Sequence, residues 1–265
     1  MHAVWSPLLL LLLLCGSAGA GFFVNSRLPE AHRSRDSMEL VQLGMGLLVT
    51  FTAIVLGLLT TSVKSGFEAA YQARGTYAGQ LAQLDRCLRD YGADMQPERE
   101  ELRAYVAAVI ASTWPDEPPP TGVDYPDTEH MQRTGENVVL AGLMNDVGLA
   151  VRSLQPTDDL HRSLAVACGQ QYSDLIKTRW AVIEGLHGSV STPFYWVLVL
   201  WLAILFASIG LTAPANPVAV IVIALSAISI TSAVFVIQDL DMPYGGLFGI
   251  PSTSMRDALA DMSAR

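Results

Sequence analysis

Charged side chains are absent from one long stretch of this chain. Between Glu184 and Asp239 the sequence contains no Asp, Glu, Lys or Arg, and one proline-containing segment, 212–217, divides it into two apolar runs. A helix satisfies its own backbone hydrogen bonds and needs about 20 apolar residues to cross roughly 30 Å of hydrocarbon. The runs 194–211 and 218–237 are therefore predicted to be membrane-spanning helices that form a hairpin.

The sequence also lacks the motifs of common enzymes. It contains no glycine-rich phosphate loop with its lysine, no Gly-x-Ser-x-Gly elbow, no His-Glu-x-x-His and no Cys-x-x-Cys. Its five histidines lie far apart and show no metal-ligand spacing. We therefore expect a protein that is not an enzyme, with no catalytic residue and no cofactor.

Cysteine is scarce as well, with three residues in a chain of 265. Cys168 lies on an apolar helical stripe and Cys87 lies beside one, so both are predicted to be thiols of a hydrophobic core. The alternative is that these two residues pair as a disulfide, which requires that this part of the chain lies in an oxidising compartment.

Two further apolar runs, 4–24 and 40–63, lie in the N-terminal part of the chain. The leucine-rich part of the first run is followed by small residues at 17–20, as in a cleaved signal peptide, although no Lys or Arg precedes it and its apolar length is long for a signal core. We expect an all-α membrane protein with four transmembrane helices and a helical extramembrane insert between the second and third. Its parts are a first hairpin at 1–63, the acidic insert at 64–190, a second hairpin at 191–238 and a tail with a short helix at 239–265.

The insert carries most of the charge. Lys64–Glu184 holds 18 acidic and 11 basic residues, and this acidic balance argues against nucleic acid as a partner. Apolar residues recur at threes and fours, which predicts helices arranged as two antiparallel pairs. The expected order is a helix from Phe67 that ends at Gly92, one that opens at Pro97, a proline-rich loop at Trp114–Pro126, a helix over 139–154 and one capped by Thr157.

The connections to the membrane are expected to be helical. No proline interrupts 40–92, and Pro193 is the only strong breaker between Thr157 and the third span. The second and third spans are therefore predicted to continue out of the bilayer as stalks. The pairs Asp85-Arg86 and Arg89-Asp90 are interpreted as a solvated helix face.

The second span carries a narrow face of small and polar residues, which we call the small-polar face. With about 100° per residue, its members fall within an arc of roughly 100°. They are Glu39, Gln42, Gly46, Thr50, Ala53, Gly57, Thr60, Thr61 and Lys64. One interpretation is a pore lining with Glu39 and Lys64 at its two mouths. The other is a packing seam, since small residues let membrane helices approach closely. Complementary faces are offered by Ala203, Ala207 and Gly210 of the third span and by Ser226, Ser229 and Ser232 of the fourth.

Two carboxylates mark the end of the fourth span. Asp239 and Asp241 precede Pro243-Tyr244-Gly245-Gly246, where they could hold a metal ion or draw cations. The simpler interpretation is that they mark the membrane boundary and cap the following turn. No metal site is predicted apart from this weak candidate.

Four ordered segments resemble a bacterial membrane protein family of unknown function that is labelled bestrophin-like. They are Arg27-Leu28-Pro29-Glu30-Ala31-His32, Gly44-Met45-Gly46 to Leu56-Gly57-Leu58-Leu59, Gln83-Leu84-Asp85-Arg86 to Arg89-Asp90-Tyr91-Gly92, and Asp239-Leu240-Asp241-Met242-Pro243-Tyr244-Gly245-Gly246. Because bestrophins are oligomeric anion channels, the resemblance implies a homo-oligomeric channel for small ions. The resemblance assigns no functional role to any single residue of this chain, because neither the neck motif nor the calcium-clasp motif of bestrophins matches these residues.

We expect a multi-pass protein of the bacterial inner membrane. Arg27, Arg33 and Arg35 crowd the loop between the first two spans, which by the positive-inside rule places the insert and both termini in the periplasm. A bestrophin-like arrangement would instead place the insert in the cytoplasm. Two functions stay open: an ion channel whose pore is lined by the second span, and a non-conducting scaffold or sensor whose insert binds a partner or stimulus.

Overall fold

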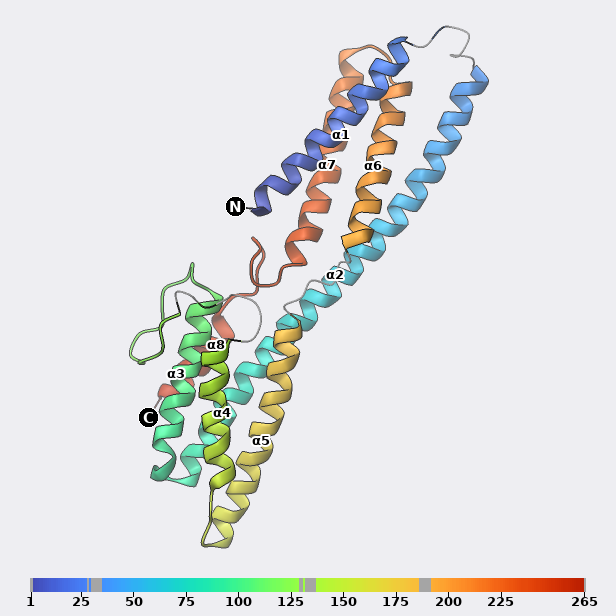
Figure 1. The fold of residues 1–265 in the computed structure, drawn as a ribbon. Helices are drawn as coiled ribbons and strands as arrows, with labels where there is room; N and C mark the ends of the chain where they lie inside the picture. The colour runs from blue at the N-terminus through green and yellow to red at the C-terminus, as the bar shows by residue number, and fades with distance from the viewer. Residues whose placement is uncertain are drawn as a thin grey trace. The chain divides into compact units, whose positions relative to one another are not determined.

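The computed structural model is described for residues 2–27, 29, 35–128, 131, 137–185 and 192–264, and these residues form helices and connecting segments without a strand. Part of the 27–32 segment therefore lies outside the described residues, as does Arg33. The helices are α1 (His2–Arg27), α2 (Arg35–Tyr91), α3 (Gln96–Thr113), α4 (Val138–Ser153), α5 (Asp159–Glu184), α6 (Thr192–Thr212), α7 (Pro217–Leu240) and α8 (Thr253–Ser263), with a short 3-10 helix at Ala93–Met95 (Figure 1).

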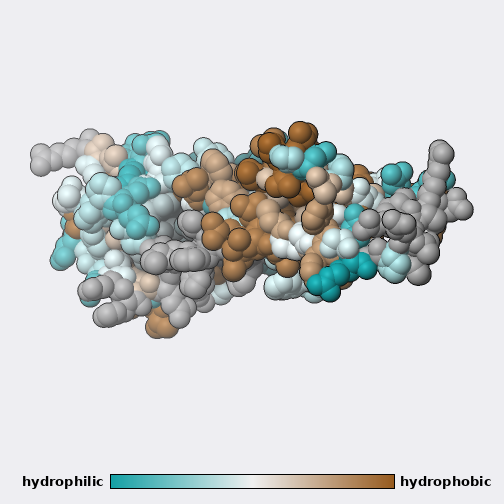
Figure 2. Space-filling view, turned by 90° about the horizontal axis from the view of Figure 1, so that it is seen from above, coloured by the Kyte–Doolittle hydropathy of each residue, from teal (hydrophilic) through white to brown (hydrophobic). Residues whose placement is uncertain are grey.

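Four of these helices are long and apolar enough to cross a membrane. The qualifying segments are Ser6–Arg27, Glu39–Tyr91, Pro193–Thr212 and Pro217–Leu240, and the predicted spans fall on the same four helices. In a space-filling view the hydrophobic side chains, in brown, gather on one part of the surface and the hydrophilic ones, in teal, on others (Figure 2). The prediction of an all-α membrane protein is confirmed.

The contacts divide the chain into two compact units. The first, which we call the membrane unit, comprises Met1–Phe67 and Gly188–Phe248; the second unit comprises Glu68–His187 and Gly249–Arg265. α2 is one continuous helix of 57 residues and supplies residues to both units, so the predicted passage of the second span into a longer helix is confirmed. The predicted continuation of the third span into α5 is not seen, because α5 ends at Glu184, where Gly185 caps it, and α6 (Thr192–Thr212) is a separate helix.

In the membrane unit α1 packs closely on α6 (Figure 1). A Cβ atom added to Gly210 would lie 1.9 Å from the carbonyl oxygen of Ala18, and one added to Gly21 would lie 1.9 Å from that of Ala207. The small residues of the third span therefore pack against the first span. Leu14 and Phe206, both fully buried, belong to the apolar cluster that this contact creates.

The second unit is built from the C-terminal part of α2 together with α3, α4, α5 and α8. Its helix ends follow from local chemistry: Gly92 after α2 has a φ of 142°, which favours glycine, and the Asn137 side chain accepts hydrogen bonds from the backbone of α4. The predicted cap of α5 at Thr157 is wrong by one residue. Asp158 caps this helix, because its carboxylate accepts a hydrogen bond from the backbone N–H of His161.

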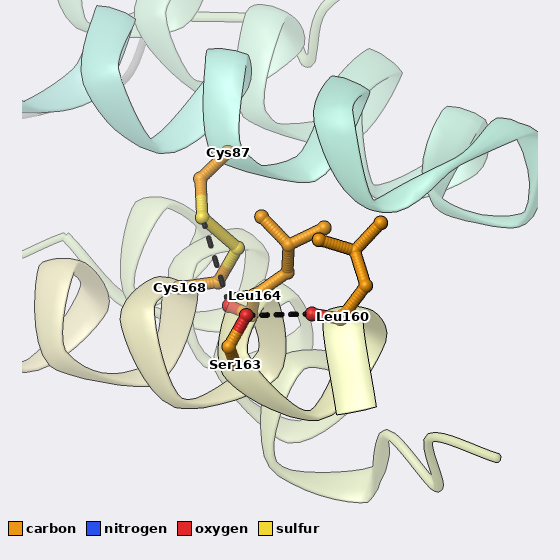
Figure 3. The surroundings of a disulfide bond; sticks show 5 residues. All are labelled: Cys87, Leu160, Ser163, Leu164 and Cys168. Carbon is orange, nitrogen blue, oxygen red and sulfur yellow. Dashed lines mark hydrogen bonds between the residues drawn. A yellow bond between two sulfur atoms is a disulfide. The ribbon is translucent and has the colours of Figure 1, made fainter. Parts of the chain in front are cut away.

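A disulfide joins α2 to α5 inside the second unit. Cys87 and Cys168 are bonded, with 5.7 Å between their Cα atoms, and both are buried (Figure 3). The bonded sulfur of Cys87 has no hydrogen to donate, so its 3.9 Å approach to the carbonyl oxygen of Leu164 is a contact only. The prediction of unpaired core thiols is wrong, and the disulfide alternative is the one that the structure contains. Spacing within each helix could place both residues near an apolar stripe but could not show that the two stripes face each other.

The C-terminal helix α8 packs against α3. The indole N–H of Trp114 donates to the carbonyl of Ile250 at 2.7 Å, and Arg256 Nε donates to Glu117 Oε2 at 3.1 Å. The pKa of Glu117 is lowered, first by the hydrogen bond that it accepts from the Ser252 hydroxyl. The part of the tail from Gly249 onward therefore belongs to the second unit, and it contacts the start of the proline-rich loop.

Candidate pore-lining face

The membrane part of α2 has one packed side. Thr52 is 5% exposed and Val63 is 1% exposed, while Leu56 and Leu59 pack against the apolar cluster that includes Leu14 and Phe206. Phe51 adds a ring contact of 6.4 Å with Trp201 of α6. This side of α2 is thus covered by the other spans of the same chain.

The small-polar face lies on the uncovered side of the same helix. All nine of its residues, from Glu39 to Lys64, are exposed in the chain. A Cβ atom added to Gly46 or Gly57 would have no heavy atom within 4 Å. The face is therefore not a seam between α2 and the other described spans, whose close small-residue contact lies between α1 and α6.

Three threonine hydroxyls on this face bond to their own helix. Thr50 donates to the carbonyl of Gly46 at 2.9 Å, Thr60 to that of Leu56 at 2.7 Å and Thr61 to that of Gly57 at 3.0 Å. Each proton is therefore satisfied inside the helix, as is common for threonine in membrane helices. The oxygen lone pairs remain available to water, so the face can be wetted without any break in the backbone ladder.

Charges stand at both ends of the face. Glu39 and Lys64 are 25 positions apart in the sequence, which corresponds to about 38 Å along an α-helix. This exceeds the roughly 30 Å of a hydrocarbon core. Both charged groups can therefore reach the two water boundaries while the uncharged part of the face lies between them.

Asp239 at the end of α7 acts as a backbone cap. Its side chain is buried, and its two oxygens accept hydrogen bonds from the backbone N–H groups of Leu247 at 2.7 Å and Phe248 at 2.8 Å. Gly246 lies so close that an added Cβ atom would meet Oδ2 of Asp239 at 2.6 Å. This geometry agrees with the interpretation that Asp239 caps the turn after α7. Among the described residues, no group of three or more His, Cys, Asp or Glu side chains is placed to hold a metal ion.

The second unit contains a buried polar cluster that periodicity did not predict. The hydroxyls of Tyr77 and Tyr105 lie 2.5 Å apart, and Arg179 Nε donates to Tyr105 at 3.3 Å. Burial raises the pKa of Tyr77 well above its ordinary value, and the neighbouring Tyr105 adds to this shift. Arg74 stacks over the Trp114 ring at 5.1 Å. The cluster ties α2, α3 and α5 together, and tyrosines within apolar stripes were its only sequence signal.

The interpretation of Asp85-Arg86 as a solvated pair is wrong for Asp85. Its side chain is 1% exposed and accepts two hydrogen bonds from Arg99 of α3, at 3.0 and 3.1 Å. Arg86 does lie at the surface, where it pairs with Asp261 of α8. Sequence spacing within one helix could not show that Arg99 comes from the next helix to meet Asp85.

Comparison with known proteins identifies the family. The model of the Bestrophin-like domain matches residues 12–255, and the chain therefore belongs to the Bestrophin-like family. No curated protein matches the chain.

Solved structures resemble the chain over its whole length. A single-residue variant of a bacterial bestrophin homologue from Klebsiella pneumoniae is 16% identical with a TM-score of 0.63, and the match covers 100% of both chains. A second variant of that homologue is 14% identical with a TM-score of 0.62 and the same coverage. A structure described only as a membrane protein is 15% identical over 96% of both chains, with a TM-score of 0.64. At this identity the likeness shows the fold.

Proposed function

We propose that this chain is one subunit of a homo-oligomeric ion channel of the bacterial inner membrane, with the small-polar face of α2 lining the pore. The proposal rests on the exposure of this face. One side of the span packs on the other spans, while all nine residues of the small-polar face remain exposed in the single chain.

An uncovered polar face in hydrocarbon is unfavourable, and assembly removes it from lipid. Copies of α2 arranged around an axis would turn Gln42 and the threonine oxygens toward water, while Gly46, Ala53 and Gly57 would leave room for an ion path. Membership of the Bestrophin-like family supports the same assignment, since bestrophins are oligomeric anion channels. The charged residues Glu39 and Lys64 would then stand at the mouths.

Conductance of the purified protein in planar bilayers tests the proposal. We expect the protein to conduct, and we expect Thr50→Trp or Gly57→Leu to change the current because each narrows the pore. Size-exclusion chromatography should show that the oligomer stays intact in both variants. Leu58→Trp and Gly44→Leu are matched controls. Leu58 is an exposed apolar residue outside the face, and Gly44, also outside it, has equally open surroundings.

Two results would count against the proposal. Absence of current across salts, voltages and pH would favour the non-conducting scaffold or sensor. Equal effects of Thr50→Trp and Leu58→Trp would show that bulk anywhere on the exposed surface disturbs the protein. In the second case the pore would have to be sought away from the small-polar face.

The proposal includes an orientation in which the second unit is extramembrane and periplasmic. The buried Cys87–Cys168 disulfide supports it, because disulfides persist in the periplasm and are rare in the reducing cytosol. The positive-inside rule gives the same orientation. Proteolysis in intact spheroplasts should cut the segment Trp114–Pro126 while a cytosolic marker protein stays whole. Cutting that requires lysis would place the second unit in the cytoplasm.

A further inference from the structure

A cavity of about 550 Å³ opens at the surface of the membrane unit between α1 and α7. One wall is a single face of α1 that includes Cys15, Ala18 and Gly19, and the other includes Val220 and Ala224 of α7. The connector between α6 and α7, from Ala213 to Asn216, lines part of it. Its volume lies within the range of ligand sites, which is roughly 300–1,000 Å³.

The cavity forms because α1 packs more closely on α6 than on α7. The carbonyl of Ala18 leaves no room for a side chain at Gly210, so α1 and α6 meet backbone to backbone. On the side toward α7, small residues of α1 face small residues of α7 without comparable contact: a Cβ atom added to Gly19 would have no neighbour within 4 Å. Small residues thus let α1 pack closely on α6, and they leave the cavity, which we call the slot, between α1 and α7.

The lining determines what can fill the slot. Among the residues that the structure describes, no charged side chain lines it, and the side-chain oxygen of Asn216 already accepts a hydrogen bond from the backbone N–H of Ala219 at 2.8 Å. A buried water needs two to four polar partners, which this lining does not offer. Hydrocarbon can fill such a space because it has no polar group that would lose its hydrogen bonds. If the space were empty, the atoms of its lining would lose dispersion contacts. The occupant is therefore apolar where it meets the walls.

We propose that this slot is a binding site for one acyl chain of a bilayer phospholipid. Its walls belong to α1 and α7, two helices long and apolar enough to cross a membrane, and in a bilayer lipid tails are the apolar groups at highest local concentration. A helix of a second copy is about 10 Å wide and would have to run past the α6–α7 connector. An acyl chain needs only one open end. A free fatty acid fits less well, because the described part of the lining provides no cation for its carboxylate.

Photolabelling of the full-length protein tests the site. The protein is reconstituted in phosphatidylethanolamine vesicles that contain a trace of the same lipid with a photoreactive diazirine in one acyl chain, and adducts are mapped by peptide mass spectrometry. We expect adducts to concentrate on the lining, at Cys15 and Val220, over lipid-facing residues such as Leu12. Gly19→Phe should reduce this labelling about tenfold, equivalent to about 1.4 kcal/mol.

Gly16→Phe is the matched control. Gly16 is an exposed glycine of the same helix with no atom within 4 Å of an added Cβ, and it does not line the slot. We expect it to leave the labelling unchanged. If Gly19→Phe does not fold, Val220→Trp tests the other wall, with Val222→Trp as its control, since Val222 is exposed outside the slot.

Four results would overturn the proposal. Adducts spread evenly over the lipid-facing residues, or unchanged by a bulky residue in the slot, would show a surface that merely faces lipid. Stronger labelling by a photoreactive free fatty acid would assign a different ligand. Oxidative cross-linking of Cys15 to Cys15 between subunits would show that a second copy fills the slot. None of these readouts depends on conductance.

Discussion

Cys87 of α2 and Cys168 of α5, which are 81 residues apart in sequence, are joined by a disulfide in the interior of the second unit. Because the bond closes a long loop, it restricts the unfolded chain strongly. It also fixes the C-terminal part of α2 against α5, and α2 is the helix that carries the small-polar face in the membrane unit.

Removal of this disulfide should destabilise the second unit. We expect the double substitution Cys87→Ala and Cys168→Ala to lower the free energy of unfolding by about 2–5 kcal/mol, mainly because the unfolded chain gains freedom. Thermal unfolding of the purified protein in detergent measures the change. Cys15→Ala is the control, since Cys15 is exposed and unbonded. The same unfolding midpoint with and without reductant would show that the bond contributes nothing.

The contact between α1 and α6 should tolerate no side chain at Gly210. Gly210→Leu would drive a branched group into the backbone of Ala18, and an overpacked contact of this kind typically costs about 1–3 kcal/mol. We expect a lower midpoint of thermal unfolding and loss of the α1–α6 contact. Gly16→Leu is the matched change at an open position. Equal midpoints for the two variants would contradict the close approach of these helices.

Glu101 of α3 should weaken the second unit at neutral pH. Its pKa is raised from 4.5 by burial, then by the charges of Asp146 and Glu98. The folded state therefore binds this proton more tightly, so stability falls as pH rises from the ordinary pKa through the raised one. Glu101→Gln should stabilise the protein at pH 7, by no more than about 1 kcal/mol because the group is only partly buried and solvent screens the repulsion. Below pH 4 the difference should vanish.

Asp146→Asn provides the partner test for the same repulsion. It should also stabilise at pH 7, and the double variant should gain less than the sum of the two single changes, since either substitution removes the repulsion. Additive effects would show that the two carboxylates do not interact.

Patterns within one helix predicted much of this fold. The four apolar runs, the end of α2 at Gly92 and the start of α3 near Pro97 follow from length, glycine and proline chemistry along a single segment. The nine residues of the small-polar face could likewise be placed together, because an α-helix has a fixed period.

Contacts between segments distant in sequence were less predictable. The bond between Cys87 and Cys168 and the ion pair between Asp85 and Arg99 each depend on which helix faces which. The same holds for the seam: Ala207 and Gly210 were expected to complement the small-polar face of the second span, whereas they pack on α1. The small-residue pattern shows that a close contact forms, but the partner helix depends on tertiary packing.

The assignment of the small-polar face to a pore is tested most directly by thiol modification during current recording. In a Cys15→Ser background, Thr50→Cys and Leu58→Cys place single thiols on the small-polar face and on the exposed apolar surface about 80° away around α2. A charged, water-soluble thiol reagent should change the current of the Thr50→Cys channel within seconds and leave that of Leu58→Cys unaltered. Current that the reagent changes in neither variant, or equally in both, would contradict a pore lined by this face.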